Sequence, residues 1–139
     1  TTIDMREIKF RAWDKEKTKW VHSNDFWIKG DGRIFGYKYV SGRATIILEN
    51  VEIMQFTGLK DKHGKEIYEG DILKYHAYHN LELKKEESVD EVTWGETGDS
   101  DGWAHENHFE YTVGIDSLAD IYGKAEIIGN IYENKELLK

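Results

Sequence analysis

Apolar and polar residues alternate along several short stretches of this chain, which is the pattern of β-strands that bury one face. The first stretch, "REIKFRAWD" at residues 6–14, places Ile8, Phe10 and Ala12 on one side and charged residues on the other. A polar turn, "DKEKT", follows it, and "KWVHS" then has the composition of a returning strand. We therefore predict a β-hairpin over residues 6–23.

Turn residues separate the later predicted strands at intervals of about eight to twelve residues. These strands lie within residues 29–40, 42–58, 70–79, 89–95, 109–114 and 124–133. The second of them is interrupted near Glu49 and Asn50. In the fourth, we expect Val92 and Trp94 to point inward, because they alternate with polar residues.

Helical signals are confined to two short segments. The first is "DSLADIYG" at residues 116–123, where Asp116 or Ser117 can cap one or two helical turns and Gly123 can end them. The second is "NKELL" at residues 134–138, which predicts a single turn near the end of the chain.

Many short strands with little helix predict a mainly β fold built from small barrels or sandwiches. A change of composition near Thr57 indicates two β lobes, a hairpin-built lobe over residues 1–56 and a small-barrel lobe over residues 57–139. We expect the second lobe to be an SH3-like barrel with one or two short helices. Residues 70–73 would open this barrel, and the strand at residues 127–132 would close it.

Composition supports a folded protein and narrows its setting. Of the 139 residues, 39% are hydrophobic and 13% are aromatic, which is typical of a globule with a buried core. Cysteine is absent, which excludes disulfides and thiolate chemistry and suits a reducing cytoplasm. No apolar run approaches the roughly 20 residues of a membrane helix. We therefore expect a cytoplasmic protein with no membrane partner.

Charge is distributed unevenly between the two predicted lobes. Residues 1–56 hold ten Lys/Arg and eight Asp/Glu, a net charge of +2, whereas residues 57–139 hold nine and nineteen, a net charge of −10. An acidic second lobe argues against nucleic acid as a partner, because binding to phosphates requires basic surface. Opposite charges on the two lobes instead favour head-to-tail self-association into a homo-oligomer.

The first lobe contains one weak candidate for nucleic-acid binding. Basic and aromatic residues are interleaved there, as they are on the strand platforms that bind single-stranded nucleic acids. The candidates are Arg6, Lys9, Arg11, Trp13, Lys19 and Trp20. Acidic neighbours dilute this signal. The aromatic residues Phe35, Tyr37 and Tyr39 are assigned to the core and faces of a sheet, with a stacking platform for bases as the alternative.

Two His-x-x-His pairs are weak candidates for a metal site, since imidazole and carboxylate groups can together hold zinc. The first pair, His76 and His79, lies on a predicted strand, where positions three apart face opposite sides. The second pair, His105 and His108, flanks Glu106 in a glycine-rich loop whose geometry is less restricted. Exposed or half-buried histidines without a metal are the simpler interpretation of both pairs.

Other chemistry is poorly supported by the sequence. The acids Glu96, Asp99 and Asp101 resemble part of a calcium loop, but the segment lacks the length and the closing glutamate. No Gly-x-Ser-x-Gly elbow and no phosphate-binding glycine loop occurs. We therefore expect no catalytic residues, no cofactor and no enzymatic activity.

The stretch "TGLKDKHGKEIYEGDILKY" at residues 57–75 is dense in charge and glycine and could be mistaken for an active-site loop. Its polar residues also suit a turn. Asp61 can accept hydrogen bonds from nearby backbone, Gly64 can adopt a positive φ, and Gly70 can form a kink or bulge. We predict that this stretch is scaffold.

Three stretches resemble the YopX family of bacteriophage and prophage proteins. They are "MREIKFRAWDK" near the start, "MQFTGLKDKHGKEIYEGDIL" in the middle and "IIGNIYENKELL" near the end. The resemblance implies a predominantly β protein from a phage or prophage, acting in the bacterial host. It brings no catalytic residues and no established activity. Residues 76–110 match nothing specific.

Four functions remain open on this evidence, one of which is a metal enzyme that uses His105, Glu106 and His108. The leading hypothesis is a non-enzymatic protein-interaction module that binds a host or phage protein and can self-associate. A second is an acidic inhibitor of a host nucleic-acid-binding enzyme, suggested by eight acids against two lysines within residues 82–101. The third is weak nucleic-acid binding through the first lobe.

Overall fold

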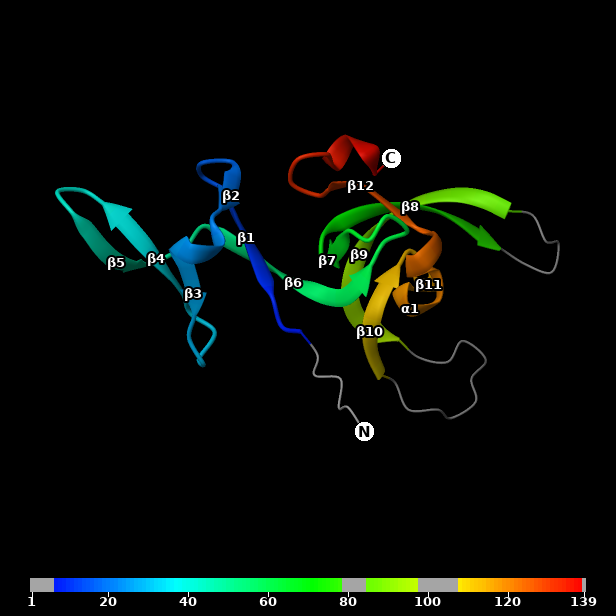
Figure 1. Cartoon of the computed structure of the whole chain (residues 1–139), viewed down its shortest axis with the longest axis horizontal. Helices are drawn as coiled ribbons and strands as arrows, with labels where there is room; N and C mark the ends of the chain where they lie inside the picture. Colours follow the sequence, from blue (N-terminus) through cyan, green and yellow to red (C-terminus); the bar gives the residue numbers. More distant parts are fainter. Residues whose placement is uncertain (1–6, 79–84, 98–107, 139) are drawn as a thin grey trace. The chain divides into compact units, whose positions relative to one another are not determined.

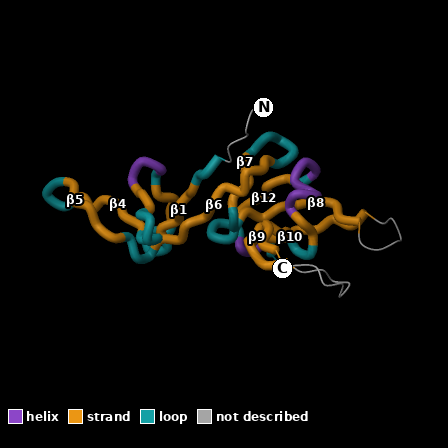
Figure 2. The backbone as a smooth tube through the Cα atoms, turned by 90° about the horizontal axis from the view of Figure 1, so that it is seen from below, coloured by secondary structure: helices purple, strands orange, loops and turns teal. Residues whose placement is uncertain are grey.

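The computed structural model describes residues 7–78, 85–97 and 108–138 of the chain (Figure 1). The chain divides into two compact units, which we call the N-terminal unit (residues 8–55) and the C-terminal unit (residues 56 onward, together with Glu7). This division falls one residue before the predicted boundary between the lobes. Strands dominate both units, as Figure 2 shows, and the prediction of a mainly β fold is confirmed.

The N-terminal unit contains two small antiparallel arrangements of strands. Its elements are β1 (Phe10–Asp14), β2 (Lys19–Val21), the 3-10 turn η1 (Ser23–Asp25), β3 (Phe26–Ile28), β4 (Ile34–Tyr39), β5 (Arg43–Ile47) and the first half of β6 (Val51–Lys60). Strand β1 pairs with both β2 and β6, and β4 pairs with both β3 and β5.

The predicted hairpin is confirmed by the pairing of β1 with β2. Its turn is held by Asp14, whose Oδ1 atom accepts hydrogen bonds of 2.9 Å from the backbone N–H groups of Glu16 and Lys17. Such an Asx turn explains why a polar sequence reverses the chain at this point. The alternation within β1 is less regular than we predicted. Ala12 and Trp13 are both buried, whereas Ile8 and Phe10 are exposed.

Strand β6 connects the two units along the chain. Its first five residues pair with β1 in the N-terminal unit, and its later residues pair with β7 (Glu66–Tyr68) in the C-terminal unit. Strand β5 ends at Ile47 and β6 begins at Val51. The predicted interruption near residues 49 and 50 is therefore confirmed.

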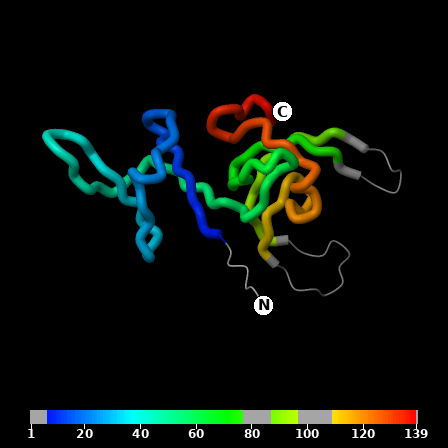
Figure 3. Tube along the Cα trace, viewed as in Figure 1, coloured from blue at the N-terminus to red at the C-terminus, as the bar shows by residue number. Residues whose placement is uncertain are grey.

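The C-terminal unit is built on a five-stranded antiparallel sheet with the order β11-β10-β9-β8-β12. Its elements are β7, β8 (Asp71–Tyr78), β9 (Lys85–Thr97), β10 (His108–Val113), β11 (Asp116–Ser117), α1 (Leu118–Ile121), the 3-10 turns η2 (Tyr122–Lys124) and η3 (Lys135–Leu137), and β12 (Glu126–Asn130). Figure 3 follows this path from green to red along the trace. The predicted opening and closing strands, β8 and β12, do pair with each other. The SH3-like identity of the barrel stays a prediction.

The main hydrophobic core lies within the C-terminal unit. It includes Ile67, Leu73, Tyr75, Val92 and Leu118, each with 2% or less of its surface exposed. Leu73, Tyr75 and Val92 come from the paired strands β8 and β9, Ile67 comes from β7 of the other sheet, and Leu118 comes from the short helix α1. The predicted helix after residue 116 is confirmed as a single α-helical turn, followed by a 3-10 turn.

Two details of β9 differ from the prediction. The strand begins at Lys85, earlier than predicted, because the acidic residues from Glu86 onward pair with β8. The inward orientation is right for Val92 but wrong for Trp94, whose side chain is 49% exposed. No helix among the described residues is long and apolar enough to cross a membrane.

Candidate binding surfaces

One face of the β3–β4–β5 sheet carries a row of aromatic rings, which we call the aromatic face. It consists of Trp27, Phe35, Tyr37 and Tyr39. The three residues on β4 are two positions apart, so they share one side of the strand, and Trp27 on β3 is paired with Phe35. The row follows from strand alternation, which the sequence already contained.

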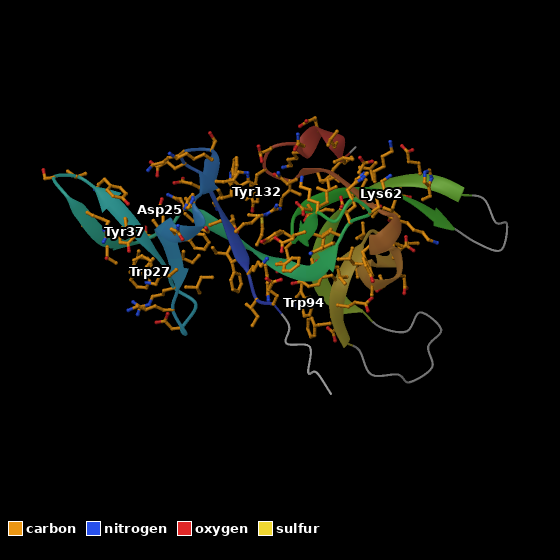
Figure 4. The ribbon with its side chains drawn as sticks, in the orientation of Figure 1. Asp25, Trp27, Tyr37, Lys62, Trp94 and Tyr132 are labelled. Atoms are coloured by element: carbon orange, nitrogen blue, oxygen red, sulfur yellow. The ribbon has the colours of Figure 1, made fainter. Side chains whose placement is uncertain are left out.

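The rings of the aromatic face contact one another in sequence along the sheet. The Trp27 ring lies 6.1 Å from that of Phe35, with nearly parallel planes, and 5.1 Å from that of Tyr37. The Tyr37 ring lies 6.3 Å from that of Tyr39. Figure 4 labels Trp27 and Tyr37 on their neighbouring strands. Tyr39 ends the row and is 65% exposed.

Three cationic side chains lie over these rings. The Lys29 Nζ atom is 4.7 Å from the centre of the Phe35 ring, and the Arg33 guanidinium is 5.4 Å from the same ring. At the other end of the row, the Arg43 guanidinium is 4.4 Å from the centre of the Tyr37 ring. Cation–π attraction therefore holds positive charge directly on the aromatic face.

The turn before β4 fixes one of these cations. Asp31 accepts hydrogen bonds from the backbone N–H and the Nε atom of Arg33, at 3.0 and 2.8 Å. These two donors hold the pKa of Asp31 below its usual value, the backbone bond being the larger cause. The carboxylate stays ionised and orients the Arg33 side chain over the sheet.

The opposite side of this sheet is packed against its own chain. A Cβ atom added to Gly36 would lie 2.5 Å from the Leu48 side chain and 3.0 Å from the backbone oxygen of Asp25. Glycine at this position therefore permits close approach of the segments on either side. The contact is local to Gly36, since Lys38 on the same side of β4 is exposed. On the ring-bearing side, Tyr39 is exposed and the other rings are half-buried.

Two open grooves lie in the N-terminal unit beside these strands. The larger, of about 600 Å³, runs along β5 and the start of β6 and includes Tyr37 and Tyr39 in its lining. The smaller, of about 300 Å³, is lined by apolar side chains that include Ile8, Phe10 and Trp27.

The nucleic-acid candidates predicted from sequence are not brought to one surface. Trp13 is buried, and its ring packs edge-on against Trp20 at 5.0 Å, with the Arg11 guanidinium 4.7 Å from the Trp20 ring. Lys19 is paired with Asp14 in the strand register, which places it on the other side of the hairpin. Lys9 precedes β1, and Arg6 lies outside the described residues. The predicted set therefore combines core and surface residues.

In the C-terminal unit, the charged stretch at residues 57–75 is built around Asp61. Its Oδ1 atom accepts hydrogen bonds from the backbone N–H groups of His63 and Lys65, both at 2.9 Å, and its Oδ2 atom accepts one from Ile127 at 3.1 Å. Burial opposes ionisation of this carboxyl, but the three donors outweigh it and hold its pKa below the usual value. Gly64 has a φ of +82°, as the turn requires.

The other acids of this stretch also make structural contacts. Asp71 is buried, and its Oδ2 atom accepts a hydrogen bond of 2.8 Å from the backbone N–H of Tyr68. Glu69 accepts a hydrogen bond of 3.2 Å from the Tyr111 hydroxyl. Ile67 is fully buried, and Gly70 has a positive φ. These contacts support the interpretation of the stretch as scaffold.

A buried phenol lies at the centre of the same unit. The Tyr75 hydroxyl is 2.9 Å from Asp90 Oδ2 and 3.0 Å from the carbonyl oxygen of Val113, so its single proton is shared between two acceptors. Burial, followed by the neighbouring carboxylates of Asp90 and Asp116, raises the pKa of Tyr75. The hydroxyl therefore remains protonated and acts as a donor that ties β8 to β9 and β10.

An exposed pair of rings marks the outer end of the β9–β10 ladder. Trp94 and Phe109 stack with their ring centres 6.1 Å apart and are 49% and 60% exposed. Tyr111, which is buried, contacts the Trp94 ring edge-on at 4.7 Å. We call Trp94 and Phe109 the ladder pair. Figure 4 labels Trp94 in this position.

Most of the predicted metal residues lie outside the described part of the chain. His79, His105 and Glu106 lie outside the described residues, as do the side chain of His108 and the acids Asp99 and Asp101. His76 is exposed on β8. Within the described part of the chain, no three His, Cys, Asp or Glu side chains gather at a distance suited to a metal ion.

The alternating rings Phe35, Tyr37 and Tyr39 were predicted to belong to the core and faces of a sheet, with a stacking platform for bases as the alternative. The missed signal is the placement of Lys29, Arg33 and Arg43 at the two ends of the ring-bearing strands. Only pairing of the strands brings these cations onto the same rings.

Comparison with known proteins places the chain in a family. A search of curated proteins gave no match. Among solved structures, the chain is similar to the crystal structure of protein EF1440 from Enterococcus faecalis, with 28% identity and a TM-score of 0.53 over 97% of this chain and 100% of that one. The sequence profile of the YopX protein family matches residues 9–139. The chain therefore belongs to the YopX family.

Proposed function

We propose that the protein is a non-enzymatic protein-interaction module whose partner docks on the ladder pair of the C-terminal unit. The observation that carries this proposal is the exposure of two stacked aromatic side chains, Trp94 and Phe109, at the edge of a well-packed core. Large aromatic residues are frequent anchors of protein interfaces, because they bury much area and lose little conformational entropy.

The ladder pair suits an interface because a buried residue of the core holds its rings in place. Tyr111 contacts the Trp94 ring and donates a hydrogen bond to Glu69, so the exposed rings sit on a fixed base. Complete burial of each ring by a partner would contribute about 1.5–3 kcal/mol. In interfaces of this kind, anchors at the centre are enclosed by a polar rim that the two partners form together.

Charge defines the class of partner. Residues 57–139 carry a net charge of −10, so a basic surface would be attracted to this unit. A second copy of the chain offers one, since residues 1–56 carry +2. Self-association is the first form of the proposal, and a basic nucleic-acid-binding enzyme of the host is the second. Both belong to the cytoplasm of a bacterium that carries the phage or prophage.

The experiment measures molar mass by size-exclusion chromatography with light scattering at low and high salt. We expect a concentration-dependent increase in mass that weakens at high salt and is lost in Phe109→Ala. The matched control is Ile115→Ala. Ile115 is 87% exposed in the same unit, and it is not one of the two stacked rings of the ladder pair.

A strict monomer at high concentration in both salts would eliminate self-association. Affinity capture from host lysate with wild-type, Phe109→Ala and Ile115→Ala baits then tests the second form. Recovery of the same proteins by all three baits would eliminate the ladder pair as the docking surface.

A further inference from the structure

The N-terminal unit presents a surface that the proposed function does not use. The aromatic face carries three half-buried rings, Trp27, Phe35 and Tyr37, and ends on the exposed ring of Tyr39. Three cations lie against the rings of Phe35 and Tyr37. A sheet that required only stability would bury such rings completely, because aromatic side chains contribute most when water is removed from them. Rings that keep part of their surface in water beside cations suit a ligand that stacks.

Local charge makes this surface basic, although the whole chain is acidic. Residues 26–47, which contain β3, β4 and β5, hold four Lys/Arg and one Asp. Three of the four cations, Lys29, Arg33 and Arg43, contact the rings of the aromatic face. The ligand should therefore combine flat, stackable groups with negative charge.

We infer that the aromatic face binds single-stranded nucleic acid, with bases stacked on its rings and phosphates paired with Lys29, Arg33 and Arg43. Every base has a π-face, so a row of rings along a strand binds successive bases with little sequence preference. Arginine serves both purposes, since a guanidinium plane can stack on a base and can also hold a phosphate.

Spacing along the strand supports this choice of ligand. Side chains two positions apart on β4 are about 6.6 Å apart along the strand, a spacing at which successive rings can each contact a different base. Trp27 and Phe35 have nearly parallel planes, with an angle of 14° between them. Duplex DNA would not use these rings, because its bases are already stacked inside the helix. An acidic peptide would use the cations but would leave most of the row unoccupied.

The cations do not block the rings. Lys29 and Arg43 reach the row from the ends of β3 and β5 on long, flexible side chains, whereas Arg33 is held by Asp31 beside Phe35. A base that enters the face replaces one cation–π contact with a stacking contact, and the displaced cation can then meet the phosphate of the same nucleotide. The ring and the cation of the original contact would then each have a partner, the ring a base and the cation a phosphate.

This inference is independent of the proposed function, because it concerns the other unit. The test uses the full-length protein and fluorescein-labelled dT12 in low salt, with binding followed by fluorescence anisotropy. We expect binding of dT12, and binding at least tenfold weaker to a dT12·dA12 duplex. We expect log affinity to fall with log salt at a slope near −2, since three phosphate contacts to a single strand give about −0.7 each.

Variants of Tyr39 test the stacking. Tyr39 is 65% exposed, so its replacement should leave the sheet folded. Tyr39→Ala should weaken dT12 binding by about tenfold, and Tyr39→Phe, which keeps the ring, should retain it. Equal affinity of the two variants would overturn the inference, as would equal binding of single-stranded and duplex DNA.

Variants of the cations test the location. Arg43→Gln should weaken dT12 binding and reduce the salt slope by about 0.7. The matched control is Lys19→Gln, a surface cation of the same unit that lies on β2, away from the aromatic face. Equal losses in the two variants would indicate general charge attraction and would overturn the assignment to this face.

A second copy of the chain is the competing occupant, and light scattering distinguishes it. If Tyr39→Ala dissociates an oligomer while dT12 does not bind, the face is a protein interface and the inference is wrong. If dT12 binds and the mass is the same in both Tyr39 variants, the inference stands. Loss of oligomerisation in Phe109→Ala with unchanged dT12 binding would leave both proposals in place.

Discussion

The two units of the molecule bury their apolar side chains to different extents. Among the described residues, ten buried apolar residues belong to the C-terminal unit, whereas the N-terminal unit has only Ala12, Trp13 and Met54. The N-terminal unit nevertheless holds most of the ring–ring and all of the cation–ring contacts described above. The C-terminal unit buries Tyr75 and Tyr111 in its core, whereas the N-terminal unit keeps Trp27, Phe35 and Tyr37 half-buried on a sheet face.

This difference shows that the number of aromatic residues in a unit does not by itself indicate how much those residues stabilise it. A small unit has little interior, so its stability depends on few side chains. Rings that remain on the surface of such a unit contribute less to folding and are available to a ligand. The C-terminal unit buries most of its large apolar side chains in one core, and the ladder pair is a pair of exposed rings that stack on each other at its surface.

The largest expected effect is in the core of the C-terminal unit. Leu73→Ala removes a fully buried side chain from that core and should lower the free energy of unfolding by about 2–5 kcal/mol. The matched change, Leu48→Ala, removes a half-buried side chain from the N-terminal unit and should cost less than about 2 kcal/mol. Urea unfolding followed by circular dichroism measures both. Equal losses would contradict the contrast between the units.

A smaller effect is expected from the turn at Asp61. Asp61→Asn removes the negative charge and places an NH₂ group, which is a donor, against at least one backbone N–H donor. It should therefore lower the free energy of unfolding by about 1–3 kcal/mol near neutral pH. The matched control is Asp120→Asn, on the exposed surface of α1, which should change little.

The effect of Asp61 should depend on pH in a defined direction. Its pKa in the folded protein is lowered from the ordinary value of 3.8, so the folded state favours the ionised form. The resulting stabilisation is fully present above pH 3.8 and is lost as the pH falls below 3.8 through the folded pKa. The difference in stability between wild type and Asp61→Asn should therefore be smaller at pH 3 than at pH 7. A difference that grows on acidification would contradict the ionised, three-donor arrangement.

The smallest effect is expected at an ion pair on the surface of the N-terminal unit. Lys15 Nζ lies 2.9 Å from Glu52 Oε1, with the two side chains 49% and 47% exposed. A double-mutant cycle with Lys15→Met and Glu52→Gln should give a coupling free energy below about 1 kcal/mol, and salt should reduce it further. A coupling above about 2 kcal/mol would show that this unit depends on surface charge more than we infer.

Much of the fold could be predicted from local sequence. The hairpin of β1 and β2, the break before β6, the turn at Asp61 and Gly64, and the short helix after Ser117 all follow from alternation and turn chemistry. Each depends on contacts between residues close in the chain, so the signal is contained in a short window of sequence.

The binding surfaces could be predicted less well. Trp94 was expected to point inward, and alternation does place it on the same side of β9 as Val92. Alternation cannot show that the core ends between these two residues. Where the core ends depends on how much of the β9 face is covered by α1 and β7. Likewise, the interleaved residues around Trp13 looked like a platform, whereas the chain uses Trp13 to fill the interior of a hairpin.

The sequence by itself determined the mainly β class, the change of charge between the two parts of the chain and the family. It also determined that Phe35, Tyr37 and Tyr39 share one side of a strand, because strand geometry repeats every two residues. Only the tertiary structure decided which of these sides is exposed and which cations lie on the rings. Trp27 and Arg43 come beside β4 because β3, β4 and β5 pair in one register, and that register together with side-chain packing decides which ring each cation meets.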